Sequence, residues 1–125
     1  MNHEKAAPLV VKLAKEFISL VRDIDPEWRK AYLRFSDFDA VAEAKASYRT
    51  DSKVVILDVR KYRQFFDDAL EQGAGVLSAL GRGEGVVLLE VNCDFDYEFH
   101  FEYEDRNRWS ISKLSGGTGV PAGME

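Results

Sequence analysis

The sequence contains few of the residues that most often build catalytic and metal centres. It has one cysteine, Cys93, and two histidines, His3 and His100, among 125 residues. A single cysteine excludes both a disulfide within these residues and a zinc site made of several cysteines, and an unpaired thiol is typical of a reducing compartment. Because no sequence signal places a histidine beside Cys93, we interpret this cysteine as a small apolar residue next to a turn rather than as a nucleophile.

Long apolar runs are also missing. No stretch approaches the ~20 apolar residues that a transmembrane helix needs. The apolar residues near the N-terminus are interrupted by Lys5, Lys12, Lys15 and Glu16, whereas a secretory signal peptide has an unbroken apolar core. We therefore expect a soluble, cytoplasmic protein that does not contact a membrane.

Basic residues are absent from one long segment of the chain. The protein has 22 acidic and 17 basic residues and a formal net charge of -5, and eight of the acidic residues lie in residues 84–105, which contain no lysine or arginine. The other 14 acidic residues are outnumbered by the 17 basic residues in the rest of the chain. Such a local concentration of negative charge attracts basic surfaces and repels nucleic acid. We expect a basic protein partner and no nucleic-acid partner.

The basic and glycine-rich stretches elsewhere do not match known binding motifs. Two basic clusters are too sparse to predict a phosphate-binding surface, and we interpret them as solvated faces: Arg29, Lys30 and Arg34, and Arg60, Lys61 and Arg63. GRGEG (81–85) follows a helical pattern and precedes a strand, the reverse of the order in a dinucleotide-binding loop. SGGTGVP (115–121) lacks the Lys-Ser/Thr pair of a phosphate-binding loop. We expect both stretches to be flexible connectors.

The hydrophobic pattern predicts two helices and several strands. Apolar residues recur at three- and four-residue spacing in residues 8–24 and 60–80, and Asp25-Pro26 ends the first helix. Strands are predicted for residues 28–35, 53–59, 86–92, 97–104 and 108–114, with a break near Asn92-Cys93-Asp94. The alanines of residues 40–49 favour a helix by propensity alone, but the turn and the β-branched run that follow favour a strand.

The resulting order is helix, three strands, helix, three strands (α-β-β-β-α-β-β-β). We expect an α+β fold in which an antiparallel meander sheet of about six strands carries two main helices on one face. We expect residues 1–114 to form a single domain and the glycine-rich residues 115–125 to form a flexible C-terminal tail.

The segment NCDFDYEFHFEYED, residues 92–105, alternates between two kinds of side chain. From Cys93 to Glu104 the odd positions are apolar or aromatic and the even positions are acidic except for His100, so a strand here has an apolar face and a negative face. Like charges on one face repel each other, and no lysine or arginine interrupts this series. We predict a docking surface for a basic protein, made of Asp94, Asp96, Glu98, His100, Glu102 and Glu104, with Glu90 and Asp105 as weaker candidates.

Three other interpretations of the same residues remain open. The acidic positions could be the solvated face of an amphipathic strand, offset by Arg29, Lys45 and Arg49. His100, Glu98 and Glu102 could ligate a metal ion, but three residues along one strand rarely converge without a fourth ligand, so we expect no metal and no cofactor. Two carboxylates could act as general acid and base in a hydrolase, but that site needs a cleft, which a flat strand face does not supply. We expect no enzymatic activity.

Three segments of the chain carry a resemblance to a known protein family. In residues 24–35, IDPEWRKAYLRF, an Ile/Pro-x-x-Trp segment leads from the first helix into a strand. Residues 40–59, AVAEAKASYRTDSKVVILDV, form a meander that leads into a helix containing Phe65, Phe66 and Leu70. Residues 86–105, VVLLEVNCDFDYEFHFEYED, form a closing hairpin with an aromatic-acidic end, here Tyr103-Glu104-Asp105. Over about residues 10–113 the chain therefore resembles the YezG-like antitoxin and immunity proteins.

The resemblance implies a small, cytoplasmic, non-enzymatic bacterial protein that binds a cognate toxin domain and neutralises it. Immunity proteins of contact-dependent growth inhibition systems, which neutralise toxins from sibling cells, are a close functional variant. We expect the toxin to be basic and of the nuclease class, with its active site occluded by the acidic surface. The alternative is an intracellular adaptor or regulatory module that binds another protein and has no connection with toxins.

Overall fold

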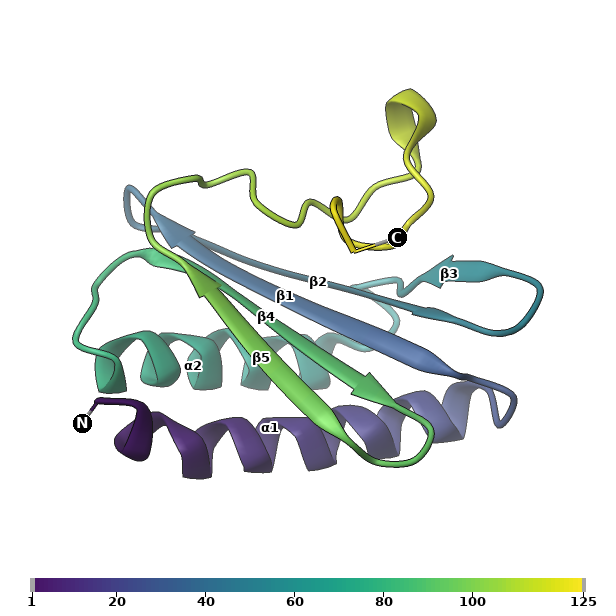
Figure 1. The fold of residues 1–125 in the computed structure, drawn as a ribbon, viewed down its shortest axis with the longest axis horizontal. Helices are drawn as coiled ribbons and strands as arrows, with labels where there is room; N and C mark the ends of the chain where they lie inside the picture. The colour runs from purple at the N-terminus through teal and green to yellow at the C-terminus, as the bar shows by residue number, and fades with distance from the viewer. Residues whose placement is uncertain (1, 125) are drawn as a thin grey trace.

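The computed structural model describes residues 2–124 and arranges them in three layers (Figure 1). A sheet lies in the middle, two helices cover one of its faces, and the C-terminal segment lies over the other. The helices are α1 (Asn2–Ile24), α2 (Arg63–Ala79) and a short 3-10 helix (Leu114–Gly116). The strands are β1 (Lys30–Phe38), β2 (Val41–Arg49), β3 (Val54–Ile56), β4 (Gly85–Asn92) and β5 (Tyr97–Glu102).

The sheet has the strand order β3-β2-β1-β4-β5, and every neighbouring pair is antiparallel. β1 is the central strand, and β3 and β5 are the two edges. The first three strands form a meander, and β4 and β5 form a hairpin on the other side of β1. α2 connects these two parts, so the hairpin pairs with β1 although about fifty residues separate them in the chain.

The main core lies between the helices and the sheet. α1 and α2 each turn an apolar stripe toward the sheet, because their buried residues recur every three or four positions: Val10, Leu13, Phe17 and Val21 of α1, and Phe66, Ala69, Gly73, Val76 and Leu77 of α2. They pack against alternate residues of the two central strands, namely Ala31, Leu33 and Phe35 of β1 and Val87, Leu89 and Val91 of β4. Within residues 2–124, neither helix is both long and apolar enough to cross a membrane.

The opposite face of the sheet has its own smaller core. Tyr32, Val86 and Leu88 point to this side and are covered by Trp109, Ile111 and Val120 of the C-terminal segment. Arg34 anchors that segment: its side chain is buried, its Nε donates a hydrogen bond to the carbonyl of Arg108 at 2.8 Å, and its Nη2 donates one to the carbonyl of Arg106. Burial lowers the pKa of Arg34 below its ordinary value.

The sequence prediction of Arg34 as part of a solvated basic face is therefore wrong. It has the chemistry of a surface residue, but its charged group is buried and donates hydrogen bonds to two backbone carbonyls. Its two neighbours in the predicted cluster do reach the surface. Arg29 pairs with Asp51 at 3.1 Å, and Lys30 pairs with Glu90.

The α+β class, the antiparallel sheet and the two helices on one face are confirmed. The sheet of the described residues has five strands instead of about six, because residues 108–114, predicted as a strand, form none. A turn at residues 106–109 takes up the start of this segment, and Trp109 has a φ of 58°, so the chain leaves the sheet edge and crosses the sheet face. α1 also begins earlier than residue 8, and Pro8 lies inside it.

Part of the predicted tail belongs to the smaller core. Val120 and Pro121 are buried, and the backbone N–H of Gly119 and that of Ala122 donate hydrogen bonds at 3.0 Å to the carbonyls of Ser112 and Ser110. The flexibility of residues 115–125 stays a prediction about motion, and Glu125 lies outside the described residues. The positions of Val120 and Pro121 are nonetheless those of core residues.

Candidate functional site: the β4–β5 hairpin

The candidate site is the hairpin at the β5 edge of the sheet. Its turn follows Asn92, whose side-chain oxygen accepts hydrogen bonds from the backbone N–H groups of Asp94 and Asp96 at 2.9 and 3.1 Å. An asparagine side chain in this role replaces backbone acceptors and favours a turn. Phe95 takes a φ of 69° at the tip. This local chemistry explains the break that the sequence predicts near Asn92.

The six predicted site residues fall into three places. Asp94 and Asp96 are exposed on the turn, and Glu104 is exposed in the turn after β5. Glu98, His100 and Glu102 lie on β5 opposite Glu90, Leu88 and Val86. They share the sheet face that carries the C-terminal segment, since Leu88 and Val86 belong to that core. The structure thus brings Glu98 and His100 together. Asp96 borders the same surface hollow as Glu98, whereas Asp94 lies on the turn and Glu104 lies beyond the other end of β5.

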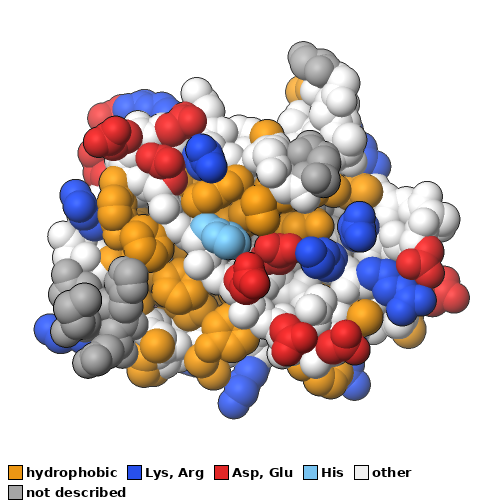
Figure 2. Space-filling model, in the orientation of Figure 1, with side chains coloured by type: hydrophobic (Ala, Val, Ile, Leu, Met, Phe, Trp, Pro, Cys, Tyr) orange, Lys and Arg blue, Asp and Glu red, His pale blue; other side chains and the backbone are white. Residues whose placement is uncertain are grey.

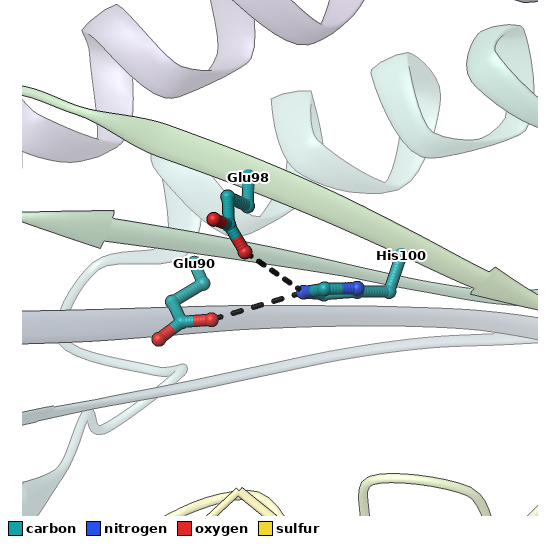
Figure 3. A group of neighbouring side chains, drawn as sticks. All are labelled: Glu90, Glu98 and His100. Atoms are coloured by element: carbon teal, nitrogen blue, oxygen red, sulfur yellow. Dashed lines mark ion pairs between the residues drawn. The ribbon is translucent and has the colours of Figure 1, made fainter.

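A charged cluster forms where β4 and β5 lie side by side (Figure 3). His100 Nε2 lies 3.8 Å from Glu90 Oε2 and 3.7 Å from Glu98 Oε2. Both distances are ion-pair distances and too long for hydrogen bonds. The Nε2 atom is buried and has no hydrogen-bond partner among the described residues. The tilted ring of Trp109, with its centroid 5.8 Å from that of the imidazole, packs against His100.

Lys30 of β1 contacts the Glu90 oxygen that does not face His100. Its ammonium lies 2.7 Å from Glu90 Oε1, and this hydrogen bond raises the pKa of Lys30 above its ordinary value. The lysine therefore neutralises Glu90 from a neighbouring strand, a partner that the alternation within residues 92–105 does not reveal. Figure 2 shows this face, where the histidine lies next to carboxylates and basic side chains. The counter-charges predicted from Arg29, Lys45 and Arg49 play no such part among the ion pairs of the described residues.

Glu102 has a structural role. Its carboxylate accepts hydrogen bonds from the backbone N–H groups of Glu104 and Asp105 at 3.0 and 3.2 Å. These bonds stabilise the ionised form and lower the pKa of Glu102 below its ordinary value. Glu102 therefore shapes the turn after β5. The sequence grouped Glu102 with Glu98 and His100 as possible metal ligands, whereas in the structure Glu90 takes the place of Glu102 beside these two residues.

The hairpin also exposes aromatic surface. Phe95 and Tyr97 are 55% and 42% exposed, although the alternation in the sequence places them on the apolar face. Between them and α1 lies an apolar groove of about 340 Å³, lined mainly by Val11, Ala14, Ile18, Phe95 and Tyr97. The guanidinium of Arg22 lies 5.3 Å from the centre of the Phe95 ring. On the other side of β5 is a polar hollow of about 310 Å³ whose walls include Asp96 and Glu98.

The hairpin therefore combines exposed rings with exposed carboxylates. Asp94 and Asp96 form no ion pair among the described residues, so their charge is available to a partner. Phe95 lies in the turn between β4 and β5, and Tyr97 is the first residue of the edge strand β5. In comparisons with known proteins, no family model and no curated sequence matches this chain.

Proposed function

We propose that this protein is a cytoplasmic immunity protein that binds a cognate toxin domain and blocks it through the β4–β5 hairpin. The observation that supports this function best is the pairing of two exposed aromatic rings, Phe95 and Tyr97, with the carboxylates of Asp94, Asp96 and Glu98. The resemblance of residues 10–113 to the YezG-like proteins points to the same function.

The chemistry of the hairpin suits inhibition by occlusion. Aromatic side chains that become buried in a partner supply much of the affinity of an interface, and charged residues at its rim mainly speed association. A toxin of the nuclease class has a basic cleft for phosphates, and the carboxylates of the hairpin would occupy that cleft. Occlusion requires no catalytic group from this chain.

The predicted docking residues differ in how far their side chains already interact with other groups of the protein. Asp94, Asp96 and Glu98 extend from the hairpin into solvent, and we assign them the main electrostatic role. Glu102 is bound to its own turn, and His100 is directed toward Glu90 and Glu98. Glu104 lies at the far end of β5 and would contact only a partner large enough to cover the whole strand.

A direct test captures the partner from a lysate of the source organism and measures its association rate with charge-reversed variants. We expect the captured protein to be toxic when it is produced alone and harmless when it is produced with this protein. The double variant D94K/D96K should slow association by about tenfold or more, and F95A should weaken affinity by a similar factor through faster dissociation.

The matched control is D67K/E71K, which makes the same change of charge at two exposed positions of α2. It should leave association with the toxin nearly unchanged. Normal binding by both D94K/D96K and F95A would place the interface elsewhere on the molecule. A captured partner without toxicity would favour the adaptor function over the immunity function.

A further inference from the structure

We infer that Glu90, Glu98 and His100 form a binding site for a divalent transition-metal ion, with Zn²⁺ as the ion that fits the ligands best. One ligand atom from each residue, two carboxylate oxygens and one imidazole nitrogen, lies within 4.8 Å of the others. Imidazole and carboxylate are common zinc ligands, and three protein ligands leave the fourth tetrahedral position for water or for a group from another molecule.

The two distances from His100 are close to those between ligands of one ion. Two ligands placed 2.1 Å from a tetrahedral zinc ion lie roughly 3.4 Å apart. His100 Nε2 lies 3.7 and 3.8 Å from the two carboxylate oxygens, so small rotations of the side chains would close the site. Hydrogen bonds would draw these atoms to about 3 Å, and the wider spacing leaves room for a shared ion.

The Nε2 atom of His100 makes ion pairs but no hydrogen bond among the described residues, although the side chain as a whole is 36% exposed. Nε2 is buried, makes no hydrogen bond to any described residue, and points between the two carboxylates (Figure 3). A buried polar atom without a hydrogen bond is costly, and the two ion pairs at 3.7 and 3.8 Å are too long to supply one. A metal ion bound by Glu90, Glu98 and His100 would supply the missing partner.

The neighbours of the cluster orient its ligands. Lys30 binds Glu90 through Oε1, which leaves Oε2 free to face His100. This is the arrangement of an outer partner that fixes a metal-ligating carboxylate. Trp109 packs on His100 from the C-terminal segment and restrains its ring. Glu98 is 74% exposed beside the polar hollow, so the open coordination position faces solvent.

Binding of zinc would join β4 to β5 and stabilise the hairpin. A ligand that binds only the folded state raises the stability of the protein in proportion to the logarithm of its concentration above Kd. The thermal midpoint of the wild-type chain should therefore rise with zinc concentration. The metal site is a property of this chain alone, so it can be tested without a toxin.

The test is a calorimetric titration of the metal-free protein with Zn²⁺, together with NMR of the imidazole signals. We expect one ion per chain, a shift of the His100 ring signals on binding, and a loss of affinity of more than about tenfold in both H100Q and E98Q. E98Q is the variant least able to disturb the fold, because Glu98 is largely exposed. E102Q is the matched control, since Glu102 lies on the same face of β5 outside the cluster, and it should bind normally.

Two further variants exclude other sources of zinc ligands. H3Q removes the second histidine of the sequence, and C93S removes its one thiol, and both should leave the affinity unchanged. The inference is overturned if the wild-type chain does not bind zinc, if H100Q and E98Q bind it normally, or if H3Q or C93S abolishes the binding.

Discussion

At residue 73 the core has no room for a β-carbon. A β-carbon on Gly73 would overlap Cγ of Phe35 and two more atoms of the same ring. Phe35 is buried in the main core, so its ring cannot move into solvent. We expect G73A to lower the free energy of unfolding by about 1–3 kcal/mol, because overpacking outweighs the better helix propensity of alanine. Urea denaturation measures this change.

Gly75 is the matched control for this prediction. It lies in the same helix, and a β-carbon there would meet only Leu9 Cδ1, at 3.5 Å, which is ordinary contact. G75A should therefore raise the free energy of unfolding by about 0.5–1 kcal/mol through helix propensity alone. If G73A were also stabilising, the packing of α2 on Phe35 would be looser than the structure shows.

The ionised Glu102 carboxylate makes the free energy of unfolding depend on pH in the acid range. Its pKa is lowered in the folded state by the N–H groups of Glu104 and Asp105, so it contributes stability above its unfolded pKa of about 4.3. That contribution is lost as the pH falls through the lower, folded pKa. E102Q should therefore be less stable than the wild type at neutral pH, and the difference should shrink below about pH 4. Urea denaturation at a series of pH values checks this, and a constant difference would contradict it.

At the scale of elements, Arg34 holds the C-terminal segment on the sheet. R34M removes both hydrogen bonds to the carbonyls of Arg106 and Arg108 while keeping an apolar stem, and it should cost about 2–4 kcal/mol of stability. Urea denaturation gives that cost, and protease sensitivity of residues 103–124 reports release of the segment. R29M is the control, because the Arg29–Asp51 pair is exposed and such pairs contribute at most about 1 kcal/mol. Equal losses in the two variants would show that Arg34 is not an anchor.

The helices and the hairpin could be predicted from the sequence because local chemistry determines them. Apolar spacing marks α2, and the turn-forming Asn92 marks the end of β4. The path after β5 depends on contacts that are distant in the chain, such as Arg34 with the carbonyl of Arg108. A strand pattern in residues 108–114 therefore predicts the apolar content of the segment correctly but not its conformation, since Trp109 and Ile111 are buried without joining the sheet.

The candidate site shows the same division. The alternation in residues 92–105 identifies Glu98 and His100 as residues on one face. Their cluster also needs Glu90 and Lys30, which only the registers of β4 with β5 and of β1 with β4 bring into place. Alternation within one strand predicts which face of the sheet each residue occupies. The pairing register between strands determines which charged residues are neighbours on that face.

At the scale of the whole molecule, the sheet is covered on both sides, and the second cover includes residues after 114. Val120 belongs to the smaller core with Tyr32 and Leu88, and Val54 and Ile56 of the edge strand β3 pack against that core. This contact partly covers the apolar side chains of β3, and exposed apolar residues at a sheet edge favour association between chains.

Deletion of residues 115–125 tests whether this cover is part of the domain. Loss of the buried side chains of Val120 and Pro121 should lower the free energy of unfolding by about 2–4 kcal/mol, since burying one apolar side chain contributes about 1.5–3 kcal/mol. A freely moving tail would instead leave stability unchanged, so urea denaturation separates the two cases. Within the full-length chain, V120A should lose about 2 kcal/mol and L114A almost nothing, because Val120 is buried and Leu114 is 81% exposed. If the deletion and V120A both left the free energy of unfolding unchanged, the C-terminal layer would not contribute to stability, and the sheet and its two helices alone would form the stable domain.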